Sequence, residues 1–196
     1  MQIIIHFKKK GLARFLSAIE LSNSILRLLQ RSKLPMEYSE GFHPTPKISF
    51  LDSTPTGMID LAMYVSVKLK ESKDFDKFKT FKYLSTNAQK GIEPVDIFFS
   101  EINLNKVVTK YEYVIFSKKY LDLSKAISKH SGKEFIPEQI MSNIEMILHK
   151  NIHMVKYIVD RQNLFNPYLI DGVFLAVRRK AFIGEDDVSN KLGGQK

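Results

Sequence analysis

The stretch YSEGFHPTPKISF brings together residues that stiffen the backbone and residues that can contact an anion. Pro44 and Pro46 fix their own φ angles and disfavour helical conformations in the residues before them, while Gly41 allows a positive φ. From this rigid segment His43 can present a titratable donor and Lys47 a positive charge. A rigid crossover into a strand would use the same prolines without a ligand, so the residue types alone allow both a site and a structural turn.

Arg14 and Ser17 supply a second part of the candidate site. Ser17 and Glu20 have the S-x-x-E spacing of a capping box, in which each side chain bonds a free N–H group at a helix start. Arg14 lies just before this helix start, where an anion is also favoured. These residue types would allow Arg14, Ser17, His43 and Lys47 to share one exposed basic surface that binds an anion such as an RNA phosphate, although by themselves they favour the rigid turn.

Signatures of catalysis and cofactor binding are missing from the sequence. It contains no G-x-G-x-x-G, P-loop, G-x-S-x-G or H-E-x-x-H motif. His149 and His153 are spaced for one helix face, as metal ligands can be, but no carboxylate has matching spacing. A chain without cysteine has no thiolate ligands for a metal or an iron–sulfur cluster. We expect no catalytic residue, no metal and no cofactor in this chain, which is not an enzyme on its own.

Composition indicates a globular protein, and its basic charge fits either a polyanionic or acidic partner or a role in solubility alone. The chain has 196 residues, of which 44% are hydrophobic, and a formal net charge of +9. Residues 1–50 contain eight lysines and arginines against three acids, a bias that favours RNA or an acidic protein surface. No apolar run approaches the length of a membrane span, and the N-terminus lacks the polarity of a secretory signal. We expect a cytoplasmic protein without membrane contact, and nothing in the pattern sets an oligomeric state.

The first half of the chain, residues 1–104, has the element order of a ferredoxin-like unit. Apolar periodicity and turn residues predict strands at 2–8, 47–51, 61–69 and 92–99, and helices at 17–32 and from Ser72 onward. The resulting order is β-α-β-β-α-β, and the fold class is α+β.

The second half, residues 105–196, is predicted to be a second, diverged α+β unit. We expect a strand at 107–117, a short helix at 120–130, and further extended segments up to residue 179. Residues 137–150 fit either a helix or a strand, and the final segment GEDDVSNKLGGQK is expected to be a frayed tail.

Residues 14–50 resemble the start of a bacterial family called radical SAM-linked proteins. The family pattern is R-F-L-S-H-L-D, a helix, and then Y-S-x-G-F-N-P-x-P-K-I-S-F. Three positions depart from it: Ala18 replaces histidine, Glu20 replaces aspartate and His43 replaces asparagine. The segment IVDRQNLFNPYLIDG weakly resembles a D-x-R-P-like part of the family. The matching residues are Arg14, Phe15, Leu16, Ser17, Tyr38, Ser39, Gly41, Phe42, Pro44, Pro46, Lys47, Ser49 and Phe50.

The resemblance implies a radical SAM protein as partner, because family members are fused to one or encoded beside one, sometimes near genes for an RNase and ribosomal proteins. Radical SAM chemistry needs three cysteines for its cluster, so the resemblance assigns that chemistry to the partner. Because the resemblance spans Arg14, Ser17, His43 and Lys47 together, it favours one shared surface over a rigid turn. We expect a non-catalytic accessory module that recognises RNA or a ribonucleoprotein through this basic surface. One alternative is a protein-docking subunit without nucleic-acid contact. Another is a CRISPR-type RNA endonuclease that uses His43 or His6 as general base.

Overall fold

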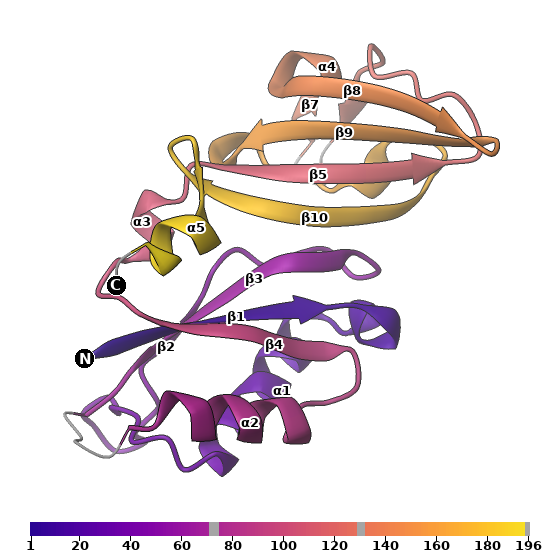
Figure 1. The fold of residues 1–196 in the computed structure, drawn as a ribbon. Coiled ribbons are helices and arrows are strands. Elements are labelled where there is room, and N and C mark those ends of the chain that lie inside the picture. Colours follow the sequence, from indigo (N-terminus) through magenta and orange to yellow (C-terminus); the bar gives the residue numbers. More distant parts are fainter. Residues whose placement is uncertain (71–74, 129–131, 195–196) are drawn as a thin grey trace.

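The computed structural model in Figure 1 describes residues 1–70, 75–128 and 132–194. It is a mixed α/β structure with one large mixed sheet and few helices. The elements of the first half are β1 (Gln2–Lys9), a 3-10 turn η1 (Gly11–Phe15), α1 (Ala18–Arg31), β2 (Ile48–Phe50), β3 (Ile59–Lys68), α2 (Lys77–Asn87) and β4 (Ile92–Phe99).

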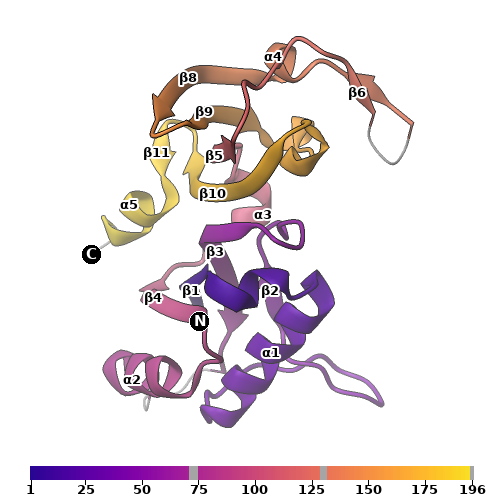
Figure 2. The same cartoon turned by 90° about the vertical axis from the view of Figure 1, so that its right-hand side faces the viewer.

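The first-half strands lie in the spatial order β4-β1-β3-β2. Strand β1 is antiparallel to both β3 and β4, and β2 is antiparallel to the end of β3. Helices α1 and α2 cover one face of these strands (Figure 2). The predicted helix at 17–32 is confirmed as α1, with Ser17 as its N-cap and the capping box to Glu20 formed.

The second half adds an antiparallel group of long strands and only short helices. Strand β10 lies parallel to the start of β3, where Val177 is opposite Ile59 and Arg178 is opposite Asp60. From there the sheet continues in the order β10-β5-β9-β8. The elements are α3 (Leu104–Val107), β5 (Lys110–Ser117), β6 (Ile127–Ser128), β7 (Glu134–Phe135), α4 (Pro137–Ile140), β8 (Met141–His149), β9 (Ile152–Asp160), η2 (Arg161–Asn163), η3 (Pro167–Leu169), β10 (Val173–Ile183), β11 (Asp186–Asp187) and α5 (Val188–Gly193).

Strand β1 is buried on both faces because each face supports a different core. Ile3 and Ile5 pack with Ile25 and other apolar residues of α1, whereas Ile4 packs with Tyr111 and other residues of the second half. This division follows from the alternation of side chains along a strand. Figures 1 and 2 show the second half stacked on the face that the helices leave open.

Several predictions for the second half are wrong. Residues 120–126 are not helical, and Ile127 and Ser128 form β6; the rest of the predicted helix, 129–130, lies outside the described residues. The segment predicted to be a frayed tail contains α5. Its Val188 and Leu192 are buried in the core that also contains Ile4 and Tyr111, called here the second core. The ambiguous segment 137–150 contains the short helix α4 and then β8.

Ser72 lies outside the described residues, and α2 is capped by Asp76, whose side chain accepts a hydrogen bond from the Lys79 N–H at 2.9 Å. None of the described helices has the length and apolar character that crossing a membrane requires.

Candidate functional site

Arg14 belongs to η1, at the end of the sheet where β3 begins. Its carbonyl accepts a hydrogen bond from the Gly57 N–H at 2.8 Å, and its guanidinium carbon lies 4.6 Å from the centre of the Phe15 ring. Its Nε is buried and has no hydrogen-bond partner in the described part of the chain. Arg14 is therefore half-buried against its own neighbours and not the open cation that we predicted.

Ser17 uses its polar groups within the helix cap. The Glu20 N–H donates to Ser17 Oγ at 3.3 Å, and the Ser17 N–H donates to Glu20 Oε2 at 2.8 Å. Hydrogen bonds from the Ser17 backbone and side chain lower the pKa of the Glu20 carboxyl. Because a carboxylate already occupies this helix start, a second anion would meet its negative charge there.

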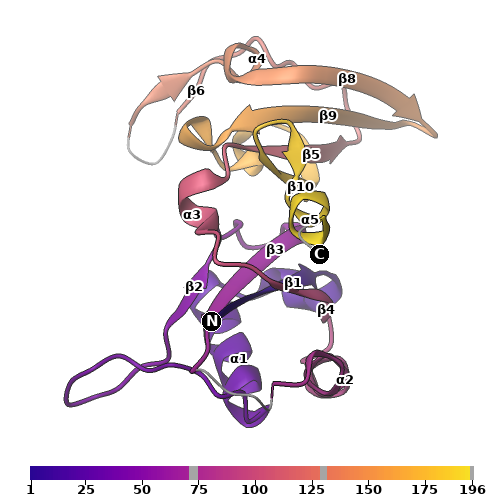
Figure 3. The same cartoon turned by 60° about the vertical axis from the view of Figure 1, so that its left-hand side comes forward.

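Residues 37–47 form a stiff hairpin, called here the 37–47 hairpin, which projects from the β2 edge of the sheet (Figure 3). The Ser39 N–H donates to the Thr45 carbonyl at 2.8 Å, and the Thr45 N–H donates to Ser39 Oγ at 3.0 Å. At its base the Lys47 N–H donates to the Glu37 carbonyl at 2.8 Å, and the two side chains form an ion pair. Gly41 near the tip has a φ of +125°, which few other residues adopt.

The proline-containing side of the hairpin presents its residues to solvent. His43 and Pro44 are exposed, and Pro46 is half-buried where it bridges to Tyr38. The prolines lie on the returning arm of the hairpin, and His43 is not enclosed in the core.

Arg14 and Lys47 do not share a surface. Arg14 is bonded to Gly57, just before β3 begins, whereas the carbonyl of Lys47 accepts from the N–H of Lys68, the last residue of β3, at 3.0 Å. The ten residues of β3 separate these points by about 30 Å at a rise of ~3.3 Å per residue. The prediction that Arg14, His43 and Lys47 converge is wrong.

A small hollow of about 220 Å³ opens beside Lys47 on the sheet. Ser49 Oγ accepts a hydrogen bond from the Asn105 side-chain amide at 2.8 Å, which leaves its hydroxyl proton free to donate. The hydrogen bond from Lys47 lowers the pKa of the Glu37 carboxyl and so favours its negative form. The ion pair between the two side chains therefore offsets the positive charge of Lys47 beside the hollow. An anion in this hollow would therefore compete with Glu37. The lining residues are Gln2, Lys47, Ile48, Ser49, Ser66, Lys68 and Asn103.

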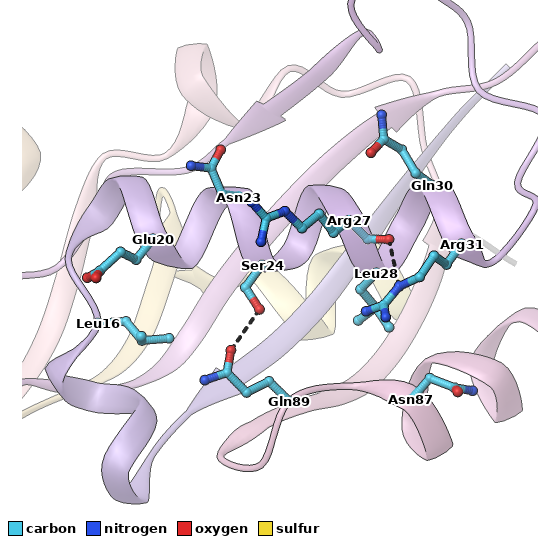
Figure 4. A pocket seen from close by; sticks show the side chains of 10 residues that line it. All are labelled: Leu16, Glu20, Asn23, Ser24, Arg27, Leu28, Gln30, Arg31, Asn87 and Gln89. Atoms are coloured by element: carbon cyan, nitrogen blue, oxygen red, sulfur yellow. Dashed lines mark hydrogen bonds between the residues drawn. The ribbon is translucent and has the colours of Figure 1, made fainter.

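A larger groove of about 610 Å³ runs between α1 and α2 (Figure 4). Arg27 and Arg31 lie one turn apart along α1, and Arg31 Nε donates to the Arg27 carbonyl at 3.2 Å. The Ser24 hydroxyl donates to Gln89 Oε1 at 2.9 Å and bridges the groove. The lining residues are Leu16, Glu20, Asn23, Ser24, Arg27, Leu28, Gln30, Arg31, Asn87 and Gln89.

The two groove arginines form no ion pair with an acidic side chain that the structure describes. In the ranges that the structure describes, the arginines that form ion pairs are Arg161, Arg178 and Arg179. Arg27 and Arg31 are both exposed. The groove therefore offers two guanidinium groups and several side-chain amides, a combination that suits phosphate oxygens and base edges. The Glu20 carboxylate also lines the groove, but it is bonded to Ser17 in the helix cap, at the other end of α1 from Arg31.

A buried ion pair joins the two halves of the chain. Arg178 is 1% exposed and donates to Asp60 Oδ1 from Nε at 2.9 Å and to Asp60 Oδ2 from Nη2 at 2.5 Å. Its Nη1 donates to the Asp52 carbonyl at 2.6 Å. Burial by itself would lower the pKa of Arg178, but the charge and hydrogen bonds of Asp60, together with Tyr113 and Tyr111, outweigh burial and raise the pKa. Lys9 is also buried beside this pair, and burial lowers its pKa against the opposing effect of Asp60.

Arg161, in the segment that follows β9, forms a second ion pair across the chain. Its Nε lies 2.6 Å from Asp52 Oδ2, its Nη2 donates to Asp52 Oδ1 at 2.9 Å, and it also bonds Asn105. The Tyr111 hydroxyl donates to the same carboxylate. Burial raises the pKa of Asp52, and the bonds from Arg161 and Tyr111 outweigh it and leave the pKa lowered. This contact orders the loop before β3 against the second half.

A family model described as "Uncharacterized protein conserved in bacteria (DUF2344)" matches residues 2–164. The chain belongs to this family. The matched region begins in β1 and ends just after η2, so it includes the helix layer, the 37–47 hairpin and the Asp52–Arg161 ion pair. A comparison with curated proteins gave no match.

The histidines of this DUF2344 protein do not form a catalytic group in the described structure. His6 is 8% exposed, lies with Nε2 2.8 Å from the Leu61 carbonyl and stacks on Tyr64 at 4.5 Å; burial lowers its pKa. His149 ends β8 and His153 lies in β9, so they do not share a helix face. The part of the chain that the structure describes holds no cluster of three or more metal-ligating side chains.

The α1/α2 groove of the DUF2344 chain was not predicted from the sequence, although the spacing of its two arginines can be read within one helix. Arg27 and Arg31 are four residues apart in the predicted helix 17–32, on the face away from its apolar stripe. The contribution of Asn87 and Gln89 depends on how α2 packs beside α1, which no local pattern encodes.

Proposed function

We propose that this DUF2344 protein is a non-catalytic accessory module that recognises RNA, alone or in a ribonucleoprotein, through the groove between α1 and α2. The observation that carries the proposal is the pair Arg27 and Arg31, two exposed guanidinium groups that form no ion pair with a described acidic residue, in a groove rich in amides. Guanidinium groups bind phosphate oxygens in a planar, bidentate manner. Side-chain amides can match the hydrogen-bonding edges of unpaired bases.

The architecture supports use of the helix layer. The strand order β4-β1-β3-β2 with two crossover helices fits a ferredoxin-like unit, and we propose that the first half is one. Single-strand-binding proteins of that type commonly use the open face of the sheet. Here that face packs against the second half, so the helix layer with its groove is the accessible side of the unit.

The resemblance to radical SAM-linked proteins supports the rest of the proposal. It implies that the module works in the cytoplasm with a radical SAM protein. A chain without cysteine cannot supply three thiolates to an iron–sulfur cluster. The module would therefore present RNA or a ribonucleoprotein to a partner that performs the chemistry.

The test is RNA binding measured by fluorescence anisotropy across a salt series, with a labelled single-stranded RNA of about 15 nucleotides. Each phosphate contact contributes about 0.7 to the slope of log K against log salt. The double variant Arg27→Gln/Arg31→Gln should therefore lower affinity and reduce that slope by about 1.4.

A matched control separates the groove from overall charge. Lys118→Gln/Lys150→Gln also removes two positive charges, but from exposed positions in the second half of the chain, away from the groove. This double variant should leave the RNA affinity nearly unchanged. No RNA binding at low salt, or equal losses in both double variants, would contradict the proposal.

The nuclease alternative has less support. His6 is buried and bonded to a carbonyl, and His43 lies on a projecting hairpin. Cleavage of a labelled RNA pool that His43→Ala abolishes would nevertheless favour this alternative over the accessory role.

A further inference from the structure

We propose that the 37–47 hairpin is a docking arm whose tip residue, Phe42, inserts into an apolar pocket of a different protein. Phe42 is 102% exposed, so its ring makes no more contact with the fold than it would in an extended chain. Burying a Phe side chain contributes roughly 1.5–3 kcal/mol. The fold forgoes this contribution at Phe42, which makes it available to a partner.

The hairpin holds Phe42 in place before any partner binds. Backbone bonds between Ser39 and Thr45 and between Glu37 and Lys47 close it at two levels. The Ser39 side chain bonds the Thr45 N–H, and the Lys47–Glu37 ion pair closes the base. An anchor presented on such a stiff arm loses little conformational entropy when it binds.

The charges of the hairpin indicate a protein as partner. Between Tyr38 and Pro46 the formally charged residue is Glu40, and the Lys47 charge at the base is paired with Glu37. Single-stranded nucleic acids and anionic lipid surfaces are held by cations around the inserted aromatic ring. The tip lacks those cations, so the chemistry that fits is an apolar protein pocket with a neutral or basic rim facing Glu40.

A second copy of the chain fits less well than a different protein. The chain does contain an apolar hollow of about 240 Å³ that includes Tyr120, Ile147 and Leu148. This hollow lies by the turn between β8 and β9, at the opposite end of the molecule from the hairpin (Figure 3). Insertion of one copy into the next would be a head-to-tail contact, which forms a closed ring only if the rotation between copies closes and otherwise gives an open filament.

The first step of the test is crosslinking in the bacterium that produces the protein, using the full chain with the photoreactive residue p-benzoylphenylalanine at position 42. The control places the same residue at position 78, because Phe78 is also an exposed phenylalanine, at 77%, but lies on α2. We expect a discrete protein adduct from position 42 that position 78 does not give. No adduct from position 42, equal adducts from both positions, or an adduct that ribonuclease removes would overturn the proposal.

The second step is a titration of the purified captured protein against wild type, Phe42→Ala and Phe42→Trp. A central aromatic anchor predicts at least a tenfold loss of affinity for Phe42→Ala, with much of the binding retained by Phe42→Trp. Equal affinity of Phe42→Ala and wild type would overturn the docking role. RNA affinity of Phe42→Ala should remain at the wild-type level, so this result does not depend on the groove.

Discussion

Four of the six arginines of this protein form two pairs with opposite environments. Arg161 and Arg178 lie where the two halves of the chain meet, and each is bonded to an aspartate. Arg27 and Arg31 lie on the outer surface of α1, exposed and without an acidic partner in the described chain. The same side chain thus serves structure in one region and remains available to a ligand in the other.

The position of Arg178 and Asp60 in the sheet explains the structural role of their ion pair. Strand β10 joins β3 through a short parallel contact in which Arg178 lies directly opposite Asp60. The buried ion pair between these residues therefore sits at the point where the sheet of the second half connects to that of the first. A partner missing from this site would leave an uncompensated charge in the core, at a cost that exceeds that of any exposed contact.

The largest effect is expected from Asp60→Asn. Asp60 is the carboxylate beside two buried cations, Arg178 and Lys9, so its loss leaves both without compensation. We expect the free energy of unfolding to fall by about 5 kcal/mol, whereas Arg178→Met should cost about 3 kcal/mol because Asp60 keeps Lys9 nearby. Urea denaturation of both variants measures the difference, and a larger loss in Arg178→Met would contradict this account of the site.

The second effect concerns Arg161, whose ion pair with Asp52 is partly open to solvent. Arg161→Met removes hydrogen bonds to the carboxylate and to Asn105 and should cost about 1.5 kcal/mol. RNA affinity should stay unchanged in the same variant. If Arg161→Met weakened RNA binding as much as the groove variants, the division between structural and ligand-binding arginines would not hold.

Local elements were predictable from the sequence, and the contrast between the arginine pairs was not. The capping box at Ser17 and the apolar stripe of α1 lie within one segment, so their pattern identifies the helix. Asp60 and Arg178 are separated by 118 positions, and their pairing depends on how β10 reaches β3. The helix α5 was missed because its burial through Val188 and Leu192 depends on the second core.

The prediction that Arg14 and Lys47 share one surface was wrong for a geometric reason. Arg14 and Lys47 are close in the sequence and were joined in one surface by a resemblance that spans both. Between them α1 runs back along the sheet for 14 residues, about 21 Å at ~1.5 Å per residue. A helix of this length carries the chain to the other end of the unit, which separates the two cations.

The third effect is a dependence of stability on pH through His6, on the face that the second half covers. Burial lowers the pKa of His6 in the folded protein, so the unfolded chain binds the proton more readily. Stability from this residue is present above the unfolded pKa of about 6.5 and is lost as the pH falls toward the lowered folded pKa. At pH 5.5 the loss is at most about 1.4 kcal/mol.

The variant His6→Gln isolates this contribution from that of the carboxylates. Its free energy of unfolding, followed by denaturation between pH 7.5 and 5.5, should fall less steeply than that of the wild type. Parallel curves for the two proteins would show that His6 is not held neutral by the fold.

The smallest change in the free energy of unfolding is expected for the groove arginines. Arg27→Gln/Arg31→Gln keeps the helix propensity of α1 nearly constant and removes no ion pair with a described residue. It loses the exposed bond from Arg31 to the Arg27 carbonyl, so the free energy of unfolding should change by less than about 0.5 kcal/mol. Urea denaturation measures this beside the anisotropy experiment. A loss of RNA affinity without a loss of stability would identify two arginines that the fold does not need, whereas a loss of 2 kcal/mol or more would place them with Arg161 and Arg178 as structural residues.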